Sequence, residues 1–282
     1  MESSRSNNIV VKVFGSSVSY MRRWLFRALS VGAIPRHVAF ILDGNRRYAR
    51  KWNLGEGMGH RAGFLSLMTL MKYCYELGVK YVTIYAFSID NFKRKPEEVQ
   101  YVMDLMLEKI EGLLKEESIV NQYGVRVEFV GNLKLLSDPV RLAAERAMEL
   151  TAKNSRAILL IAVAYTSTDE IAHAAQQSCL DKIQTRSGFC FGFAKADDDA
   201  ITIRLGDVES HMYMGVAPDP DILVRTSGET RLSNFLLWQT SNSLLYSPRA
   251  LWPEMGLRHL VWIVLNFQRV QPYLERRRKL LS

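Results

Sequence analysis

Residues 37–49 read HVAFILDGNRRYA, and this stretch constrains the fold more than any other. An apolar run of strand length ends in the Asp-Gly-Asn triplet 43–45, and Arg46 and Arg47 follow where a helix can begin. In open α/β sheets, ligand sites lie beyond the carboxyl ends of strands. Backbone N–H groups at such a turn face anions, and arginines add positive charge for phosphate. A plain turn, with Asp and Gly present for their backbone preferences, explains the stretch equally well.

The carboxylate of Asp43 needs its own explanation in a turn that binds phosphate. It would repel the ligand unless a hard cation lies between them, and Mg²⁺ commonly bridges protein carboxylates and substrate phosphates. We therefore expect a magnesium ion at Asp43 if this turn binds phosphate.

The composition is that of an ordinary globular chain with a basic excess. The 282 residues can bury a large core, and 48% are hydrophobic while 23% are charged. The net charge of +8 favours an anionic partner, which nucleic acid, a lipid surface or a phosphorylated substrate would each satisfy. Cys74, Cys179 and Cys190 lack C-x-x-C spacing, so a reducing, cytosol-facing location fits best. The apolar run 158–165 is shorter than the roughly 20 residues that span a bilayer.

Strand-like and helix-like segments alternate along most of the chain. Concentrations of β-branched, aromatic and apolar residues predict strands at 37–42, 80–87, 125–130, 157–165 and 221–225. Helical spacing of apolar residues predicts helices at 59–77, 96–114, 138–152, from 168 onward and at 257–268. Residues 176–220 are expected to form a loop with short helices. The alternation predicts a single α/β domain with a mainly parallel central sheet flanked by helices.

This domain is expected to span residues 36–270, between an N-terminal segment 1–35 and a basic C-terminal tail 271–282. Residues 1–19 are polar, and an amphipathic helix follows, with Met21 and Trp24 on its apolar face and arginines opposite. Such a helix lies in a membrane interface or packs on its own domain, and a transit peptide has similar features.

Two of the predicted helices carry long apolar faces, at residues 64–71 and 99–114. Faces of this kind usually pack in the core. The wall of a tunnel for a hydrocarbon chain would have the same pattern, so both alternatives remain.

Polar residues gather at three strand ends, at 43–47, 88–94 and 225–233. The carboxyl ends of parallel strands lie on one edge of a sheet, so the three clusters can converge there. Together they hold more arginines than one phosphate requires, which favours diphosphate groups with a divalent ion. The chain has no P-loop, no G-x-S-x-G nucleophile elbow and no H-E-x-x-H zinc motif.

These residues carry a resemblance. The chain resembles the cis-prenyltransferases, the family of undecaprenyl and dehydrodolichyl diphosphate synthases, and is most similar to plant members that include rubber-type transferases. The similarity runs from about His37 to about Arg269, through HVAFILDGNRRYA, GHRAG, YAFSIDNFKR, RTSGETRLSNFLLWQ and LWPE. It implies the cis-prenyltransferase fold, in which a hydrophobic tunnel receives the product.

The resemblance also implies an activity, namely repeated 1′-4 condensation of isopentenyl diphosphate onto an allylic diphosphate such as farnesyl diphosphate, with Mg²⁺. Asp43 would be the catalytic and metal-binding carboxylate, and Asn91 stands where the family's proposed proton acceptor stands. Because an amide is a poor base, we expect Asn91 to orient substrate while a diphosphate oxygen takes the proton. The residues implied for the allylic diphosphate are Gly44, Asn45, Arg46, Arg47, Tyr48, His60, Ser88, Phe92 and Arg94. Those implied for isopentenyl diphosphate are Arg225, Arg231 and Ser233.

The chain departs from the bacterial pattern in three places. Ser243 stands near the position of a second acidic metal ligand, and Glu56 replaces an arginine that contacts the allylic diphosphate. Homodimeric members also end in an Arg-x-Gly motif that enters the partner's active site, and residues 269–282 lack it. Eukaryotic relatives with this gap take the motif from an inert, membrane-anchored homologue related to the Nogo-B receptor. We therefore expect a heteromer, bound peripherally to the cytosolic face of the endoplasmic reticulum, with the cytosol as the alternative.

Two rival hypotheses belong to other functional classes. An inert scaffold subunit of such a complex would have no use for Asp43 or for the set formed by Arg225, Arg231 and Ser233. A nucleic-acid-binding protein would explain the charge, but the chain lacks a basic stripe interleaved with aromatics, so nucleic acid is not expected as a partner.

Overall fold

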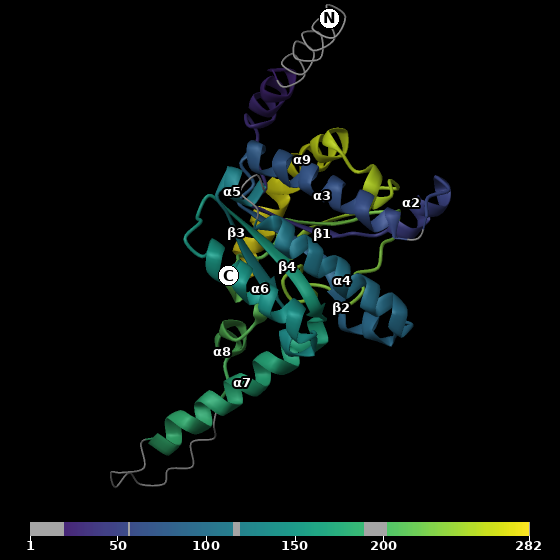
Figure 1. Ribbon diagram of the computed structural model, residues 1–282. Coiled ribbons are helices and arrows are strands. Elements are labelled where there is room, and N and C mark those ends of the chain that lie inside the picture. Colours follow the sequence, from purple (N-terminus) through teal and green to yellow (C-terminus); the bar gives the residue numbers. More distant parts are fainter. Residues whose placement is uncertain (1–19, 56, 115–118, 189–201, 282) are drawn as a thin grey trace, which may run out of the picture.

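The computed structural model describes residues 20–55, 57–114, 119–188 and 202–281 (Figure 1). The expected polar tail at 1–19, Glu56 and Cys190 lie outside these ranges.

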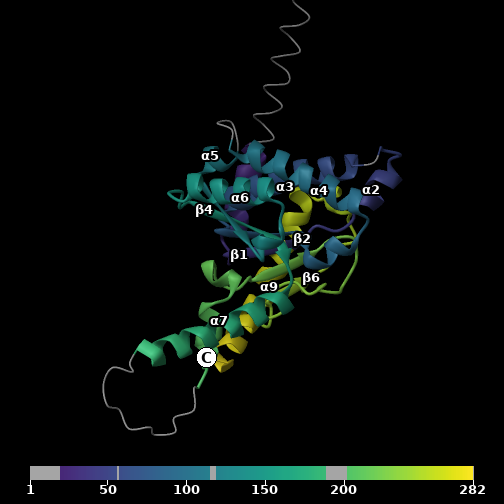
Figure 2. The same cartoon turned by 60° about the horizontal axis from the view of Figure 1, so that its bottom comes forward.

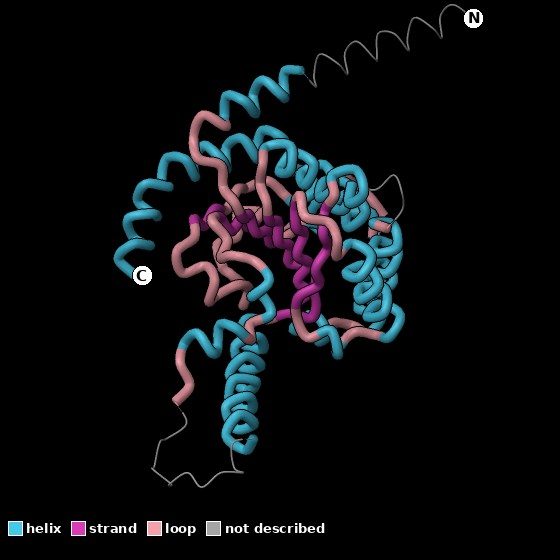
Figure 3. Tube along the Cα trace, turned by 90° about the vertical axis from the view of Figure 1, so that its left-hand side faces the viewer, coloured by secondary structure: helices cyan, strands magenta, loops and turns pink. Residues whose placement is uncertain are grey.

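A six-stranded parallel sheet forms the centre of the molecule, in the order β3-β4-β2-β1-β5-β6. The strands are β1 (His37–Ile41), β2 (Tyr81–Ser88), β3 (Val125–Val130), β4 (Ala157–Tyr165), β5 (Ile222–Arg225) and β6 (Leu244–Tyr246). Figure 3 shows the strands at the centre, with helices around them. The predicted parallel sheet is confirmed, and β1, β2 and β5, whose ends carry the polar clusters, are neighbours within it.

Helices surround this sheet. They are α2 (Asn45–Lys51), α3 (Met58–Leu77), α4 (Pro96–Leu113), α5 (Ile119–Tyr123), α6 (Asp138–Thr151), α7 (Ser167–Gly188), α8 (Leu205–Ser210) and α9 (Leu257–Leu281). Short 3₁₀ helices lie at Ile89–Lys93, Leu133–Leu135, Tyr213–Val216 and Trp252–Glu254. Pro96 occupies the first turn of α4, where its missing N–H costs nothing, and Gly78 ends α3 in a left-handed conformation.

The two faces of the sheet are covered differently. Val38 and Phe40 of β1 point into the larger core, which α3, α4, α6 and α9 close. Ala39 and Ile41 point into a smaller core against Phe235 and Leu236, which belong to a loop. Figure 2 shows α3, α4 and α6 in one layer above the strands. The second face is therefore held by loop packing rather than by long helices.

Several elements differ from the sequence predictions. α7 continues to Gly188, so the first part of the expected loop 176–220 is helical. α9 continues past its predicted end at residue 268 to Leu281, although its basic residues 276–279 are exposed as expected of a tail. β6 and α5 were not predicted.

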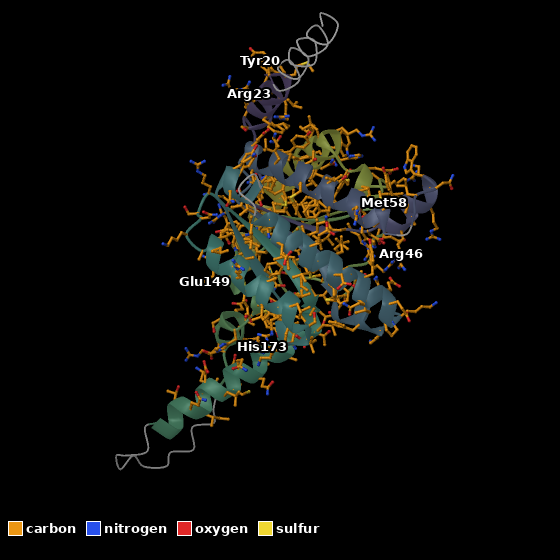
Figure 4. All side chains as sticks on the ribbon, viewed as in Figure 1. Tyr20, Arg23, Arg46, Met58, Glu149 and His173 are labelled. Carbon is orange, nitrogen blue, oxygen red and sulfur yellow. The ribbon has the colours of Figure 1, made fainter. Side chains whose placement is uncertain are left out.

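The helix over residues 20–29 packs on its own domain, which is one of the alternatives that the sequence left open. Phe26 and Leu29 are buried in the larger core, and Arg22 pairs with Glu76 of α3 at 2.8 Å. Trp24, on the outer face, is 65% exposed. Figure 4 shows Tyr20 and Arg23 at the end of this helix that lies away from the body. No helix in the described ranges is long and apolar enough to span a membrane.

Candidate active site

A cavity of about 750 Å³ extends from the carboxyl ends of β1, β2 and β5 down between the sheet, α3 and α4. Its deeper wall is apolar and is formed by Phe64, Leu67, Met68, Ile84, Phe87, Val102, Leu105, Met106, Ile110, Leu113, Phe129, Leu159 and Ile161. Its mouth is polar and is formed by Asp43, Asn45, Arg46, His60, Ser88, Asp90, Asn91, Arg94, Arg225, Arg231, Ser233 and Asn234. The apolar faces of α3 and α4 thus line a cavity as well as the core.

Asp43 follows β1 directly and lies between two guanidinium groups. Its Oδ1 accepts from Arg47 Nη2 at 3.1 Å, and its Oδ2 accepts from Arg225 Nη2 at 2.9 Å. Burial raises the pKa of Asp43, but the hydrogen bonds from Arg225 and Arg47 outweigh it, so the pKa lies below its ordinary value. Thr226 fixes the backbone, because its Oγ1 accepts from Asp43 N and donates to Asp43 O. Asp43 is therefore an ionised, pre-positioned carboxylate.

Arg225 joins Asp43 to the loop that follows β5. Its Nη1 donates to Ser233 Oγ and to the carbonyl oxygen of Arg231, each at 2.5 Å. The Arg225 side chain is 7% exposed, and its Nε has no partner within the described part of the chain. A buried donor without a partner is costly, so it favours an anionic ligand here.

A second basic group lies across the mouth from Arg225. Arg46 of α2 and Arg94 both pair with Glu98 Oε1, at 3.3 and 2.9 Å. Arg46, labelled in Figure 4, reaches from α2 to Glu98 in the first turn of α4. Burial, with the nearby charges of Arg46 and Arg94, lowers the pKa of His60, so the imidazole is neutral near pH 7 and can donate one hydrogen bond.

Asn91 lies beside this second group, in the 3₁₀ helix that follows β2. Its Oδ1 accepts from the backbone N–H of Ser88 at 3.0 Å, and Ser88 Oγ accepts from Asp90 N at 3.2 Å. This reciprocal capping holds both side chains at the mouth. The carbonyl oxygen of the Asn91 amide is thus already engaged.

Four of the residues implied by the resemblance do not line the cavity. Gly44 forms the turn after β1 with φ 109°, a left-handed value that favours glycine. Arg47 reaches Asp43 and Ser227 instead, Tyr48 packs beside Trp52, and Phe92 packs edge-on against Phe87. The other ten lie at the mouth.

Sequence reasoning missed several residues that shape the mouth. Thr226 Oγ1 bonds both the N–H and the carbonyl oxygen of Asp43, and Glu98 pairs with Arg46 and Arg94. Glu229, an acid of the polar cluster expected at 225–233, pairs with Arg47 and Arg231. Their positions directly after the predicted strand or at the predicted helix start were the available signal. Lys109 of α4 also lines the otherwise apolar wall, with its ammonium 5.0 Å from the centre of the Phe64 ring.

The described residues contain no group of three His, Cys, Asp or Glu side chains placed to hold a metal ion.

Comparison with known proteins decides the family. The sequence pattern of the family described as putative undecaprenyl diphosphate synthase matches residues 41–275. The chain belongs to this family.

Relatives in this prenyltransferase family are similar over nearly the whole chain. Dehydrodolichyl diphosphate synthase 6 of Arabidopsis thaliana is 58% identical, over 98% of this chain and 96% of its own. Rubber cis-polyprenyltransferase HRT2 of Hevea brasiliensis is 57% identical, over 96% of each chain. The human dehydrodolichyl diphosphate synthase complex subunit is 36% identical, over 94% of this chain and 76% of its own.

A solved structure agrees with the fold. Lavandulyl diphosphate synthase from Lavandula x intermedia, in complex with dimethylallyl diphosphate, has a TM-score of 0.71 and 28% identity. It covers 83% of this chain, which is 95% of that structure. The chain is thus a cis-prenyltransferase that elongates prenyl chains. The alternative hypothesis of an inert scaffold subunit is not favoured.

Proposed function

We propose that this chain is the catalytic subunit that condenses isopentenyl diphosphate repeatedly onto farnesyl diphosphate, giving a long-chain cis-polyprenyl diphosphate of the dolichol or rubber type. The observation that carries this proposal is the polarity of the cavity. Two basic groups flank Asp43 at the mouth, and the walls below are apolar. Such a site accommodates two diphosphates side by side and a hydrocarbon tail beneath one of them.

The Arg46–Arg94 side of the mouth would hold the allylic diphosphate. When substrate binds, Arg46 and Arg94 would release Glu98 and pair with phosphate oxygens instead. Neutral His60 would donate one hydrogen bond to the same diphosphate. Arg47 lies behind Asp43 and adds positive charge. As the bond from the allylic C1 to its diphosphate oxygen breaks, these cations stabilise the charge on the leaving group.

The Arg225 side would hold isopentenyl diphosphate through three groups, namely Arg225 Nε, the Arg231 guanidinium and the Ser233 hydroxyl. The C4 carbon attacks the allylic C1, and the C2 proton then leaves. Because the amide oxygen of Asn91 already accepts from Ser88 N–H, we propose that Asn91 orients substrate and that a diphosphate oxygen takes the proton.

The mouth also fits Mg²⁺. Asp43 is an ionised carboxylate whose side chain is 24% exposed, and one carboxylate with substrate phosphate oxygens is a usual magnesium environment. When bound by Asp43 and the diphosphates, the ion would neutralise charge on the departing diphosphate.

We further propose that the chain works with an accessory subunit related to the Nogo-B receptor. The support is the name of the human relative, which describes it as a subunit of a complex.

A labelled isopentenyl diphosphate assay with farnesyl diphosphate and Mg²⁺ tests these proposals. We expect turnover with the partner subunit. In Asp43→Asn the turnover should fall by about 10²–10³-fold, because the carboxylate that would bind Mg²⁺ beside the departing diphosphate is removed. Asp104→Asn, which changes an exposed carboxylate on α4, is the matched control and should retain full activity. Equal turnover without a partner would end the heteromer proposal, and an unaffected Asp43→Asn would end the catalytic assignment.

We also propose peripheral binding to the endoplasmic reticulum membrane through the helix over residues 20–29. Its outer face exposes Met21 and Trp24 beside Arg23 and Arg27, a combination typical of interfacial helices. Trp24→Glu should reduce flotation with phosphatidylcholine–phosphatidylserine vesicles and leave turnover intact. Leu142→Glu, at an exposed apolar residue of α6, is the control. Unchanged flotation of Trp24→Glu would contradict this role.

A further inference from the structure

The helices that close the larger core differ sharply in charge. Residues 20–31, 58–75 and 257–274, which include the N-terminal helix and most of α3 and α9, contain no Asp or Glu. Their lysine and arginine residues are Arg22, Arg23, Arg27, Arg61, Lys72, Arg258 and Arg269. In contrast, α4 carries Glu97, Glu98, Asp104, Glu108 and Glu111, and α6 carries Asp138, Glu145 and Glu149. The helical layer is therefore divided into a basic, acid-free part and an acid-rich part.

The three acid-free segments lie side by side. α3 packs against α9. Near the end of α3, Arg22 pairs with Glu76 at 2.8 Å, and Gln268 Nε2 of α9 donates to the Leu29 carbonyl oxygen at 2.8 Å. The helix over residues 20–29 thus contacts both of the others. Figure 1 shows α3 and α9 at the same end of the molecule as this helix.

The outer side of α9 combines cations with large apolar side chains. Its exposed residues recur at helical spacing and include Arg258, Trp262, Leu265, Arg269 and Tyr273. The indole-bearing side chain of Trp262 is 58% exposed, whereas the opposite side of α9 is buried in the larger core. A stripe of this kind offers both charge and apolar area to a partner outside the chain.

α3 and the N-terminal helix present the same combination. On α3, Leu65 is 67% exposed, and Arg61 and Lys72 lie four and seven residues from it, on the same stripe. On the N-terminal helix, Trp24 is exposed beside Arg27. Because the buried sides of all three helices point into the larger core, their exposed sides point away from it. These exposed sides together are called the three-helix face.

We propose that the three-helix face binds an anionic lipid surface. Its arginines complement lipid phosphate and carboxylate groups, and the tryptophan and leucine side chains between them enter the boundary of the acyl chains. The inference rests on the membrane binding proposed for residues 20–29 and extends it to α3 and α9, which belong to the catalytic domain. An acidic protein surface would satisfy the charges but not the apolar side chains, and vesicle binding separates the two.

The three-helix face also lies on the outer side of a cavity wall. Phe64 and Met68 of α3 line the cavity, whereas Leu65 of the same helix faces outward. Because a helix with its side chains is about 10 Å across, bound lipid would lie about that far from hydrocarbon in the cavity. The catalytic domain itself would therefore rest against the membrane, with α3 and α9 nearest to it.

The test is flotation of the purified full chain with phosphatidylcholine vesicles that contain or lack phosphatidylserine. Trp262→Ala should lower the partition coefficient by about tenfold, because the indole no longer enters the lipid. Arg258→Gln combined with Arg269→Gln should lower it by about 25-fold with phosphatidylserine, since each cation near an anionic surface contributes about fivefold. The same double variant should change binding little when phosphatidylserine is absent.

Matched substitutions away from the three-helix face are the controls. Leu150→Ala removes an exposed apolar side chain of α6. Lys134→Gln combined with Arg146→Gln removes the same charge as the arginine double variant, at two other exposed positions. Both controls should float like the wild type. Thermal unfolding should show every variant folded, because all of the changed side chains are exposed.

The outcomes separate the three-helix face from the proposed role of the N-terminal helix. Loss of flotation in Trp262→Ala and in the arginine double variant, with unchanged controls, supports the proposal. If these variants float like the wild type while Trp24→Glu does not, residues 20–29 bind lipid alone and the three-helix face is refuted. Equal losses in the controls would also overturn it. A wild-type chain that floats with neither vesicle would refute all membrane binding, and the isopentenyl diphosphate assay would still decide the catalytic proposal.

Discussion

Replacing Gly59 by alanine would place a methyl group 2.2 Å from the carbonyl oxygen of Asn45. Gly59 lies in the first turn of α3, and Asn45 begins α2, so the two helices touch backbone to backbone here. Ordinary contact begins at 3.4 Å, so α2 must move by more than 1 Å to admit the methyl group. α2 carries Arg46 and Arg47, and both would move with it.

The expected effect on activity exceeds the effect on stability. Overpacking lowers the free energy of unfolding by about 1–3 kcal/mol, whereas alanine in place of glycine in a helix raises it by about 1 kcal/mol. The net loss of unfolding free energy is therefore about 1 kcal/mol. For a chain of this size that lowers Tm by about 2–4 °C. A shift of about 1 Å in a substrate-positioning group can cost about 10²-fold in rate, so kcat/KM for farnesyl diphosphate should fall by that order.

Gly112→Ala is the control for Gly59→Ala. Gly112 lies on α4, and a Cβ there would meet nothing within 4 Å. The Gly112→Ala substitution should raise Tm slightly, because alanine has the higher helix propensity. It should leave the kinetic constants for both diphosphate substrates unchanged. Thermal unfolding and steady-state kinetics on the two variants complete the comparison. A Gly59→Ala enzyme as stable and as active as Gly112→Ala would refute the contact between α2 and α3 as the reason for this glycine.

Two further outcomes follow from the site and from the sheet. Arg225→Lys should raise the KM for isopentenyl diphosphate by about 10–100-fold, because one ammonium cannot serve Asp43 and Ser233 together; steady-state kinetics measures this, and an unchanged KM would contradict it. Burial, opposed by a hydrogen bond to the Pro218 carbonyl and the charge of Asp221, lowers the pKa of His37 to about 4 in the folded chain. Between about pH 6.5 and 4 the unfolded chain therefore binds a proton that the folded chain does not, so stability falls as the pH is lowered, by about 3 kcal/mol in all. Denaturant titrations at pH 7 and pH 4 measure how much unfolding free energy each protein loses between the two pH values. This loss should be about 3 kcal/mol smaller in His37→Gln than in the wild type, and equal losses would contradict the assignment.

The elements that sequence reasoning predicted are those with a strong local pattern. β1, β2 and β5 are short apolar runs that end in polar clusters, and parallel pairing alone brings their ends together. The apolar faces of α3 and α4 have a clear helical period. These local signals were enough to predict most of the mouth of the cavity.

The missed features depend on contacts between distant residues. The far half of α7 extends away from the sheet (Figures 1 and 3) and pairs with the short helix α8 through polar residues, so it lacks the apolar period of a helix packed on the core. β6 is three residues long and exists only because β5 pairs with it. Arg47 pairs with Glu229 and Tyr85 stacks on Phe235, although the two residues of each pair lie far apart in the chain. No spacing within either segment contains that information.

Apart from Lys109, the charged residues of the cavity lie at its mouth, and this has a consequence for product release. A polyprenyl diphosphate is an amphiphile with the same polarity as the cavity, so its headgroup and its tail are both retained by the enzyme that made it. Each methylene buried along the Phe64 and Met106 walls adds about 0.8 kcal/mol to that retention. Dissociation into water therefore slows with every condensation, whereas a bilayer or a detergent micelle would accept the tail at little cost. If the chain binds a membrane as proposed, the lipid would act as the acceptor that allows the enzyme to begin its next chain.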